Sequence, residues 1–268
     1  MYAHPSACRA FCISLPVLLE HSYRQYGCKH QLVPVILNRL LSSGVVGLAD
    51  VHTDDVYHDP ARDKPLRLAG DQNGLPLDDT LQGQNGGDWL YGMRGDDTLV
   101  GGLGDDRLYG GSNADFLRSQ TGDDQLWGGN GDDRLNSGDN DDGLYGGIGS
   151  DTLNGNIGTD TLVGGKDADV FDFDAAGDSG LGKARDVIRH FQDGEGDKID
   201  LSGVDANVDL SGNQAFTFID DGTFNAAGQL RFAADLHVLY GNTDADATPE
   251  FSIQLSGVTS LNAAAVFL

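Results

Sequence analysis

Pairs of adjacent carboxylates recur through the middle of this chain, each pair next to a glycine. The segment from Gly92 to Tyr109 reads GMRGDDTLV GGLGDDRLY, so one nine-residue pattern occurs twice in succession. Neighbouring like charges repel each other, whereas a divalent cation such as Ca²⁺ prefers several hard oxygen donors together. The spacing therefore predicts cation binding, provided that the fold brings successive aspartates side by side.

The pattern continues in register on both sides of this segment. From Gly83 the nonapeptides are GQNGGDWLY, GMRGDDTLV, GGLGDDRLY, GGSNADFLR, SQTGDDQLW, GGNGDDRLN, SGDNDDGLY, GGIGSDTLN, GNIGTDTLV and GGKDADVFD, and a weaker copy, GLPLDDTLQ, begins at Gly74. Asp occupies the sixth position of all eleven copies, and the eighth is Leu in ten and Phe171 in the last. The segment resembles the calcium-binding repeats of the RTX family.

The repeat chemistry predicts a parallel β-roll over residues 74–172. Glycines at the first, second and fourth positions allow positive φ, and Asn113, Asn140 or Asp167 replaces the fourth glycine where it is missing. The first six residues should form a turn and the last three a short strand, with the eighth side chain pointing inward. Two nonapeptides make one coil, so equivalent turns recur at every second repeat.

Aspartates two repeats apart should stack along one edge of the roll and line a space with carboxylate and carbonyl oxygens. Oxygen donors in six- to eight-fold number suit Ca²⁺, and no soft ligand competes for the site. The candidate ligands are the sixth-position aspartates Asp79, Asp88, Asp97, Asp106, Asp115, Asp124, Asp133, Asp142, Asp151, Asp160 and Asp169. The candidate turn glycines are Gly92, Gly95, Gly101, Gly102, Gly104, Gly110, Gly128, Gly131, Gly146 and Gly149.

The net charge of −25 disfavours nucleic acid and anionic membrane surfaces as partners. Of the 42 acidic residues only Glu20, Glu195 and Glu250 are glutamate, which indicates turns rather than general surface acidity. A core of one apolar side chain per nonapeptide is thin. We therefore expect the repeats to be disordered without Ca²⁺ and to fold as they bind it.

Beyond the repeats, residues 173–268 contain strand-like runs separated by Gly, Asn and Asp. The segments GGKDADVFDF, DVIRHF, DKIDLS, QLRF and EFSIQLSGV resemble the C-terminal domain of serralysin-type (peptidase M10) secreted metalloproteases. This resemblance implies a β-rich domain, extracellular localisation, and a type I secretion exporter as a partner that reads the closing LNAAAVFL. That terminus lacks the acidic residue often found before the final hydrophobic residues, and docking as a last strand is a further role for it.

Two acidic loops lie in this tail, at 193–197 and 242–250. Neither matches an EF-hand, and solvated loops are the favoured interpretation of both, with metal binding as the alternative.

The ninth positions of the repeats form two columns at the outer face of the roll. One column is mostly polar, whereas the other reads Tyr91, Tyr109, Trp127, Tyr145 and Val163. We favour an aromatic ladder that stiffens the sheet, with a contact face for another domain or a glycan as the alternative.

Residues 1–73 do not resemble the rest, and we interpret them as a mis-assigned start or a remnant fused upstream. They contain Cys8, Cys12 and Cys28, which together with His21 and His30 are candidate zinc ligands. The spacing of these residues fits no established zinc motif. The apolar run FCISLPVLL lacks the flanks of a signal peptide, and no run reaches the length of a membrane span.

The sequence contains neither H-E-x-x-H nor G-x-S-x-G. The leading hypothesis is therefore a non-catalytic, secreted calcium-binding module. Two alternatives stay open: a truncated serralysin-like protease or polysaccharide-modifying enzyme without its catalytic domain, and an adhesive surface protein.

Overall fold

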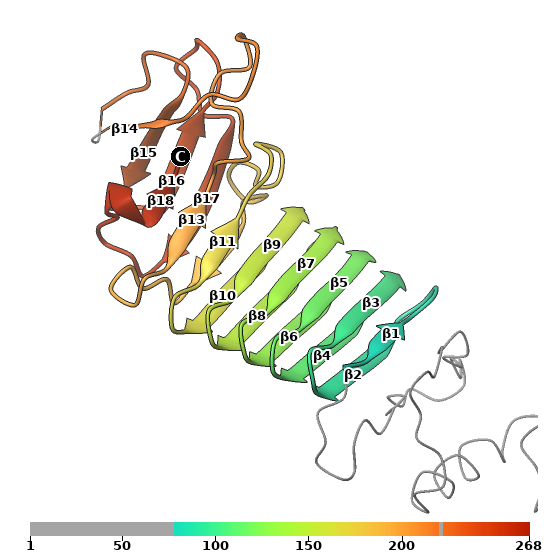
Figure 1. The fold of residues 1–268 in the computed structure, drawn as a ribbon. Coiled ribbons are helices and arrows are strands. Elements are labelled where there is room, and N and C mark those ends of the chain that lie inside the picture. The colour runs from blue at the N-terminus through green and yellow to red at the C-terminus, as the bar shows by residue number, and fades with distance from the viewer. Residues whose placement is uncertain (1–77, 220–221) are drawn as a thin grey trace, which may run out of the picture. The chain divides into compact units, whose positions relative to one another are not determined.

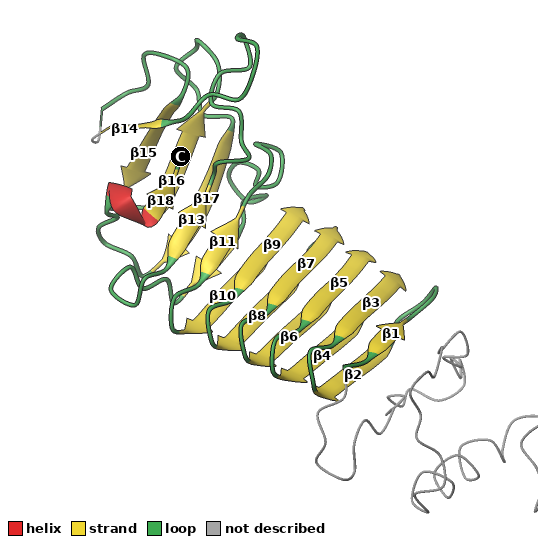
Figure 2. Ribbon diagram, viewed as in Figure 1, coloured by secondary structure: helices red, strands yellow, loops and turns green. Residues whose placement is uncertain are grey.

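The computed structural model describes residues 78–219 and 222–268, and strands are the main regular secondary structure in both ranges (Figure 2). A three-residue 3-10 helix, Ala263–Ala265, is the single helical element in these ranges. The all-β class predicted from the sequence is confirmed. The cysteines and the apolar N-terminal run lie outside the described residues.

The repeats wind a roll whose strands alternate between two sheets (Figure 1). One sheet has the order β1 (Thr80–Gln82), β3 (Thr98–Leu103), β5 (Phe116–Thr121), β7 (Arg134–Asp139), β9 (Thr152–Ile157), β11 (Val170–Asp172), β13 (Lys198–Asp200) and β18 (Val266–Phe267). The other has the order β2 (Trp89–Arg94), β4 (Arg107–Ser112), β6 (Gln125–Asn130), β8 (Gly143–Ile148), β10 (Thr161–Lys166), β12 (Val187–Arg189), β17 (Phe251–Ser256), β16 (Val238–Asn242), β15 (Gln229–Ala233) and β14 (Thr217–Ile219).

Neighbouring strands of the roll are parallel and are offset by two nonapeptides. Leu90 lies opposite Leu108 in one sheet, and Leu99 lies opposite Leu117 in the other. All the eighth-position side chains from Leu81 to Phe171 are buried and belong to one apolar core, whereas the flanking positions are mostly half-buried or exposed. The predicted coil of two nonapeptides and the inward eighth position are confirmed.

The strands are longer than the sequence predicted. β3 spans six residues, from the seventh position of one nonapeptide to the third position of the next, so the turn proper is confined to the fourth to sixth positions. The prediction of a six-residue turn was wrong because a positive φ at the second position does not end the ladder: Gly102, with φ +121°, still pairs with Gln120.

The tail continues both sheets of the roll instead of starting new ones. β12 pairs in parallel with β10, and β13 pairs in parallel with β11, so the sheets run on past Asp172. β17 and β18 then add to β12 and β13, and β16 and β15 follow β17 in antiparallel order. The apolar C-terminus docks as a last strand, with Val266 opposite Ile199.

Candidate metal centre

The sixth-position aspartates form two stacked rows, one on each edge of the roll. Within a row, the backbone N–H of each aspartate donates to Oδ1 of the aspartate two repeats later, as from Asp115 to Asp133 at 2.8 Å. This bond recurs from Asp79 to Asp169 with N···O distances of 2.7–3.0 Å. The stacking predicted for these side chains is therefore present.

The second oxygen of most of these carboxylates is buried and has no hydrogen-bond partner among the described residues. This holds for Oδ2 of Asp97, Asp106, Asp115, Asp124, Asp133, Asp142, Asp151, Asp160 and Asp169, and also for Oδ2 of Asp186 in the tail. A buried carboxylate oxygen without a partner is costly. A row of such oxygens is a donor set for a hard cation, so these residues fit Ca²⁺.

Burial also makes these carboxyls weak acids. It is the largest cause that raises the pKa of Asp151 to about 8 and that of Asp160 to about 9. Repulsion adds to burial, since the carboxylates above and below carry the same charge, and the accepted backbone N–H partly offsets both. The pKa of other aspartates in the two rows is raised in the same direction, to about 7 at Asp97, Asp106, Asp115, Asp142 and Asp169.

Carbonyl oxygens approach the same space as the carboxylates. A Cβ built on Gly110 would overlap with Oδ2 of Asp115 and also with the carbonyl oxygen of Gly128 in the next coil. These two oxygens therefore lie close together beside Gly110. The same arrangement at Gly92 brings together Asp97 Oδ2 and the carbonyl oxygen of Gly110.

The candidate glycines fall into two groups. The first-position glycines Gly92, Gly101, Gly110, Gly128 and Gly146 have no positive φ, which corrects the expectation from sequence. Glycine at these five positions avoids a collision between a Cβ and the Oδ2 atom of the aspartate five residues later. The others have positive φ: Gly95, Gly104, Gly131 and Gly149 lie in the turn, and Gly102 lies within β3. Asn113, Asn140 and Asp167 also have positive φ, as predicted.

The two adjacent carboxylates of a repeat face opposite directions along the stack. Oδ1 of Asp132, at a fifth position, accepts from the N–H of Ser150 in the following coil at 2.8 Å. Oδ1 of Asp133, at a sixth position, accepts from Asp115 in the preceding coil. The fifth-position acids are exposed, whereas the sixth-position acids from Asp88 onward are buried. Both kinds join neighbouring coils, and the sixth-position acids also line the cation space.

The ends of the rows differ from the middle. Asp79 is only partly buried, and Asp88 uses Oδ2 to accept from the N–H of Gln84 at 2.9 Å. At the other end, the rows run on into the tail, where the N–H of Asp160 donates to Asp186 at 2.8 Å and that of Asp169 donates to Asp197 at 3.1 Å.

Asp186 and Asp197 belong to these rows but were not predicted from the sequence as site residues. Both are buried, and each immediately precedes a short strand whose central isoleucine continues the core. DVIR and DKID keep the end of the repeat, D-x-U-x, without its glycines, and that remnant is the signal that could have identified them. The interpretation of 193–197 as a solvated loop is therefore wrong for Asp197.

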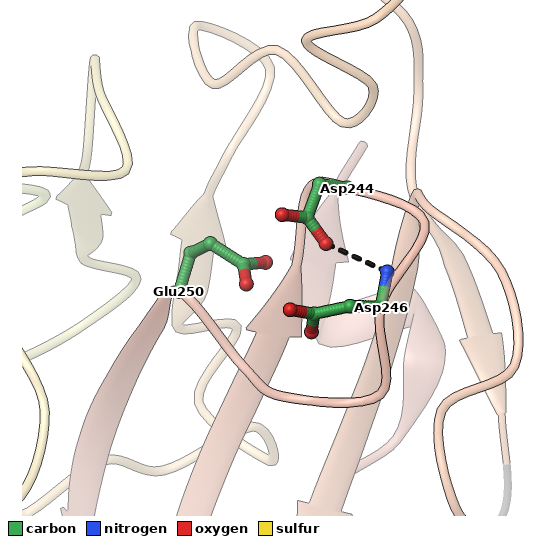
Figure 3. A group of neighbouring side chains, drawn as sticks. All are labelled: Asp244, Asp246 and Glu250. Carbon is green, nitrogen blue, oxygen red and sulfur yellow. Dashed lines mark hydrogen bonds between the residues drawn. The ribbon is translucent and has the colours of Figure 1, made fainter.

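The second acidic loop brings three carboxylates together. Ligand oxygens of Asp244, Asp246 and Glu250 all lie within 4.8 Å of one another, and their carboxylates face a common space (Figure 3). Asp244 and Glu250 are half-buried, and Asp246 is exposed.

The aromatic column forms a continuous stack on the outer face of the roll. Ring centroids are 4.6 Å apart for Tyr91–Tyr109, 4.4 Å for Tyr109–Trp127 and 5.6 Å for Trp127–Tyr145, with interplanar angles of 9° or less. The rings cover one another's faces, and the tail strands extend the sheet beyond Val163 instead of lying over the column. This geometry supports the ladder rather than a docking or glycan-binding face.

Comparison with known proteins gives two family matches. Residues 91–267 match the peptidase M10 serralysin C-terminal family, and residues 73–108 match the RTX calcium-binding nonapeptide repeat in four copies. No curated protein matches the chain. A matching solved structure is the solution structure of the AlgE6R3 subunit from the Azotobacter vinelandii mannuronan C5-epimerase, with 28% identity over 58% of this chain and 77% of that chain and a TM-score of 0.31. Among the described residues, no helix has the length and apolarity needed to cross a membrane.

Proposed function

Because this chain belongs to the peptidase M10 serralysin C-terminal family, we propose that it is a secreted module that folds on binding Ca²⁺ outside the cell. The cofactor of its nonapeptide repeats is Ca²⁺. In this proposal residues 74–172 are the calcium-binding roll, and residues 173–268 complete its sheets and carry the signal that a type I exporter reads.

The observation that carries the proposal is the row of buried Oδ2 atoms without partners among the described residues. In the absence of a cation, folding takes these carboxylates out of water and places them between like charges. Coordination reverses that balance, because each oxygen then has a positively charged partner. The ligands for a cation are split between coils, so binding and folding are one process.

Calcium-dependent folding explains why the chain folds after export and not before it. Sites in extracellular modules typically bind at sub-millimolar to millimolar Ca²⁺, far above the levels inside a cell. The chain therefore stays extended in the cytosol and folds outside. The C-terminus can act as a signal in the unfolded chain and be covered later, since Val266 ends buried beside Ile199.

We propose no catalytic role for the described residues themselves. The family takes its name from a peptidase, but its H-E-x-x-H zinc motif does not occur in this sequence. A proteolysis assay on the purified chain distinguishes this proposal from the alternative of a serralysin-like or polysaccharide-modifying enzyme, since activity would favour the enzyme.

Far-UV circular dichroism of the full chain tests the folding step. In EDTA we expect the spectrum of a largely disordered chain, and added Ca²⁺ should produce β-structure cooperatively. Mg²⁺ should substitute poorly because it demands a tighter octahedral shell. A chain equally rich in β-structure in EDTA would contradict the proposal.

A further inference from the structure

We propose a second kind of cation site outside the roll, in the loop between β16 and β17, held by Asp244, Asp246 and Glu250 with Asn242 as a further oxygen donor. This site is independent of the repeats. It is formed by one short loop, whereas each site of the roll is shared between coils.

The spacing of the three carboxylates suits a single large ion. Calcium–oxygen distances of about 2.3–2.6 Å place two ligands on opposite sides of an ion up to roughly 5 Å apart. The oxygens of Asp244, Asp246 and Glu250 lie within 4.8 Å of one another, so one calcium ion can reach all three (Figure 3). Mg²⁺, with distances of about 2.0–2.1 Å, spans less.

Each carboxylate uses one oxygen to hold the loop and leaves the other available. Asp244 Oδ1 accepts from the N–H of Asp246 at 2.8 Å, and Asp246 Oδ1 accepts from the N–H and hydroxyl of Thr248, both at 2.6 Å. Glu250 Oε2 accepts from the N–H of Thr243. The second oxygens of all three take no hydrogen bond from the described residues, so the loop is held in place before any ion binds.

The observation that points to a ligand is the side chain of Asn242. It is fully buried at the end of β16, and its Nδ2 donates to the carbonyl oxygens of Asp246 at 2.7 Å and Thr248 at 3.1 Å. The amide group of Asn242 therefore faces the loop through Nδ2, and Oδ1 is bonded to the same carbon. This Oδ1 is buried and has no partner among the described residues.

A solvated acidic loop does not account for that oxygen. Exposed carboxylates are satisfied by water, but a buried amide oxygen needs a donor or a cation. The loop is not an EF-hand, because it lacks the glycine and glutamate of that motif, so the pattern of oxygens and not a sequence signature identifies it.

The position of the site gives it a structural role. The loop joins the antiparallel strands β16 and β17, and β17 pairs in parallel with β12, which continues the sheet of the roll. The N–H of Gln254 in β17 donates to the carbonyl oxygen of Asp186 at 2.9 Å. An ion in the loop therefore fixes the end of the β16–β17 hairpin, which connects the rest of the tail to the sheet of the roll through β12.

The test uses the full chain with the double variant Asp244→Asn and Glu250→Gln. Both substitutions keep an oxygen that can accept the loop hydrogen bonds, and together they remove two charges. The matched control is Asp209→Asn with Asp235→Asn, two exposed residues whose side chains hold no loop. Bound Ca²⁺ is counted by equilibrium dialysis at saturation, and hydrogen exchange follows peptides from 242–250 and from the roll separately.

We expect the double variant to bind one Ca²⁺ fewer than the wild type and the control, and to lose calcium-dependent protection in 242–250 while its roll peptides stay protected. Unchanged stoichiometry together with unchanged protection in 242–250 would overturn the site. Unaltered protection of the roll in the variant also shows that the chain still folds. A failure of the proposed function is a separate result, since wild-type roll peptides would then be insensitive to Ca²⁺.

Discussion

The backbone N–H of Asp160 donates to Oδ1 of Asp186 at 2.8 Å, although 26 residues separate the two in sequence. Within the repeats the same bond always joins aspartates two nonapeptides apart. A longer loop between Asp160 and Asp186 is therefore accommodated without a break in the row. The tail is bonded to the roll by the same contact that bonds one coil to the next.

Loss of an interior aspartate should matter more than loss of the first one. The side chain of Asp133 is buried and accepts from the N–H of Asp115, whereas Asp79 is half-buried and begins the row. A hydrogen bond to a charged group contributes about 1.5–3 kcal/mol. Asp133→Ala should therefore raise the Ca²⁺ midpoint of folding severalfold, and Asp79→Ala much less, in parallel circular dichroism titrations. Equal midpoints would argue against the stacked rows.

Adding one methyl group at a first-position glycine should weaken Ca²⁺ binding. The Cβ in Gly128→Ala would collide with Oδ2 and Cβ of Asp133, and such overpacking costs about 1–3 kcal/mol. Gly177→Ala is the matched control, because a Cβ there meets open space. We expect a higher Ca²⁺ midpoint by calorimetry for Gly128→Ala alone. A shift of the same size in both variants would assign the effect to glycine replacement in general.

Serine occupies the same position in two repeats, and there its hydroxyl has a hydrogen-bond partner. Ser119 donates to the carbonyl oxygen of Ser137 at 2.8 Å, and Ser137 donates to that of Gly155 at 3.0 Å. Gly128→Ser should therefore shift the midpoint less than Gly128→Ala.

Acid should partly replace calcium. Burial raises the pKa of Asp151 to about 8 and that of Asp160 to about 9 in the folded chain, against about 3.9 when unfolded. Between these values the folded chain binds more protons, so its stability is present below about pH 4 and is lost as pH rises through about 8–9. In EDTA, β-structure measured by circular dichroism should increase from pH 8 to pH 5. A chelated chain that is unaffected by pH in this range would contradict the pKa shifts.

The aromatic ladder should stabilise the folded roll without binding calcium. Tyr109→Ser with Trp127→Ser removes all three stacked pairs, each contributing about 0.5–1.5 kcal/mol beyond burial. The Tm of the calcium-bound chain should fall by several degrees, while the Ca²⁺ stoichiometry stays constant. Arg118→Ser with Asn136→Ser, in the opposite column, is the control. If both pairs of substitutions lower the Tm equally, the stacking adds nothing.

The strictly periodic features could be predicted from the sequence. The inward leucines, the rows of aspartates and the positive φ of Asn113 all follow from position in the repeat, because each coil meets an almost identical neighbour. The reason for the first glycine could not be predicted, since it depends on where Oδ2 of an aspartate in the same repeat comes to lie.

Features of the tail were harder to predict because the period ends there. Asp186 and Asp197 take part in the rows through loops of unequal length, so spacing alone does not identify them. The grouping of Asp244, Asp246 and Glu250 depends on the turn between two antiparallel strands. Acidic residues at alternate positions in the sequence occur both in such a turn and in a solvated loop, so the pattern does not distinguish the two.

The offset of two nonapeptides between neighbouring strands also determines how such a chain can change in length. Removal of a single nonapeptide, such as 110–118, would transfer every later strand to the opposite sheet and place Trp127 in line with Val100 instead of Tyr109. Removal of 110–127 would leave each row in its own sheet, with Tyr109 next to Tyr145. The unit of insertion or deletion that this fold tolerates is thus the pair of repeats, and an odd number carries a cost that the repeat sequence itself does not reveal.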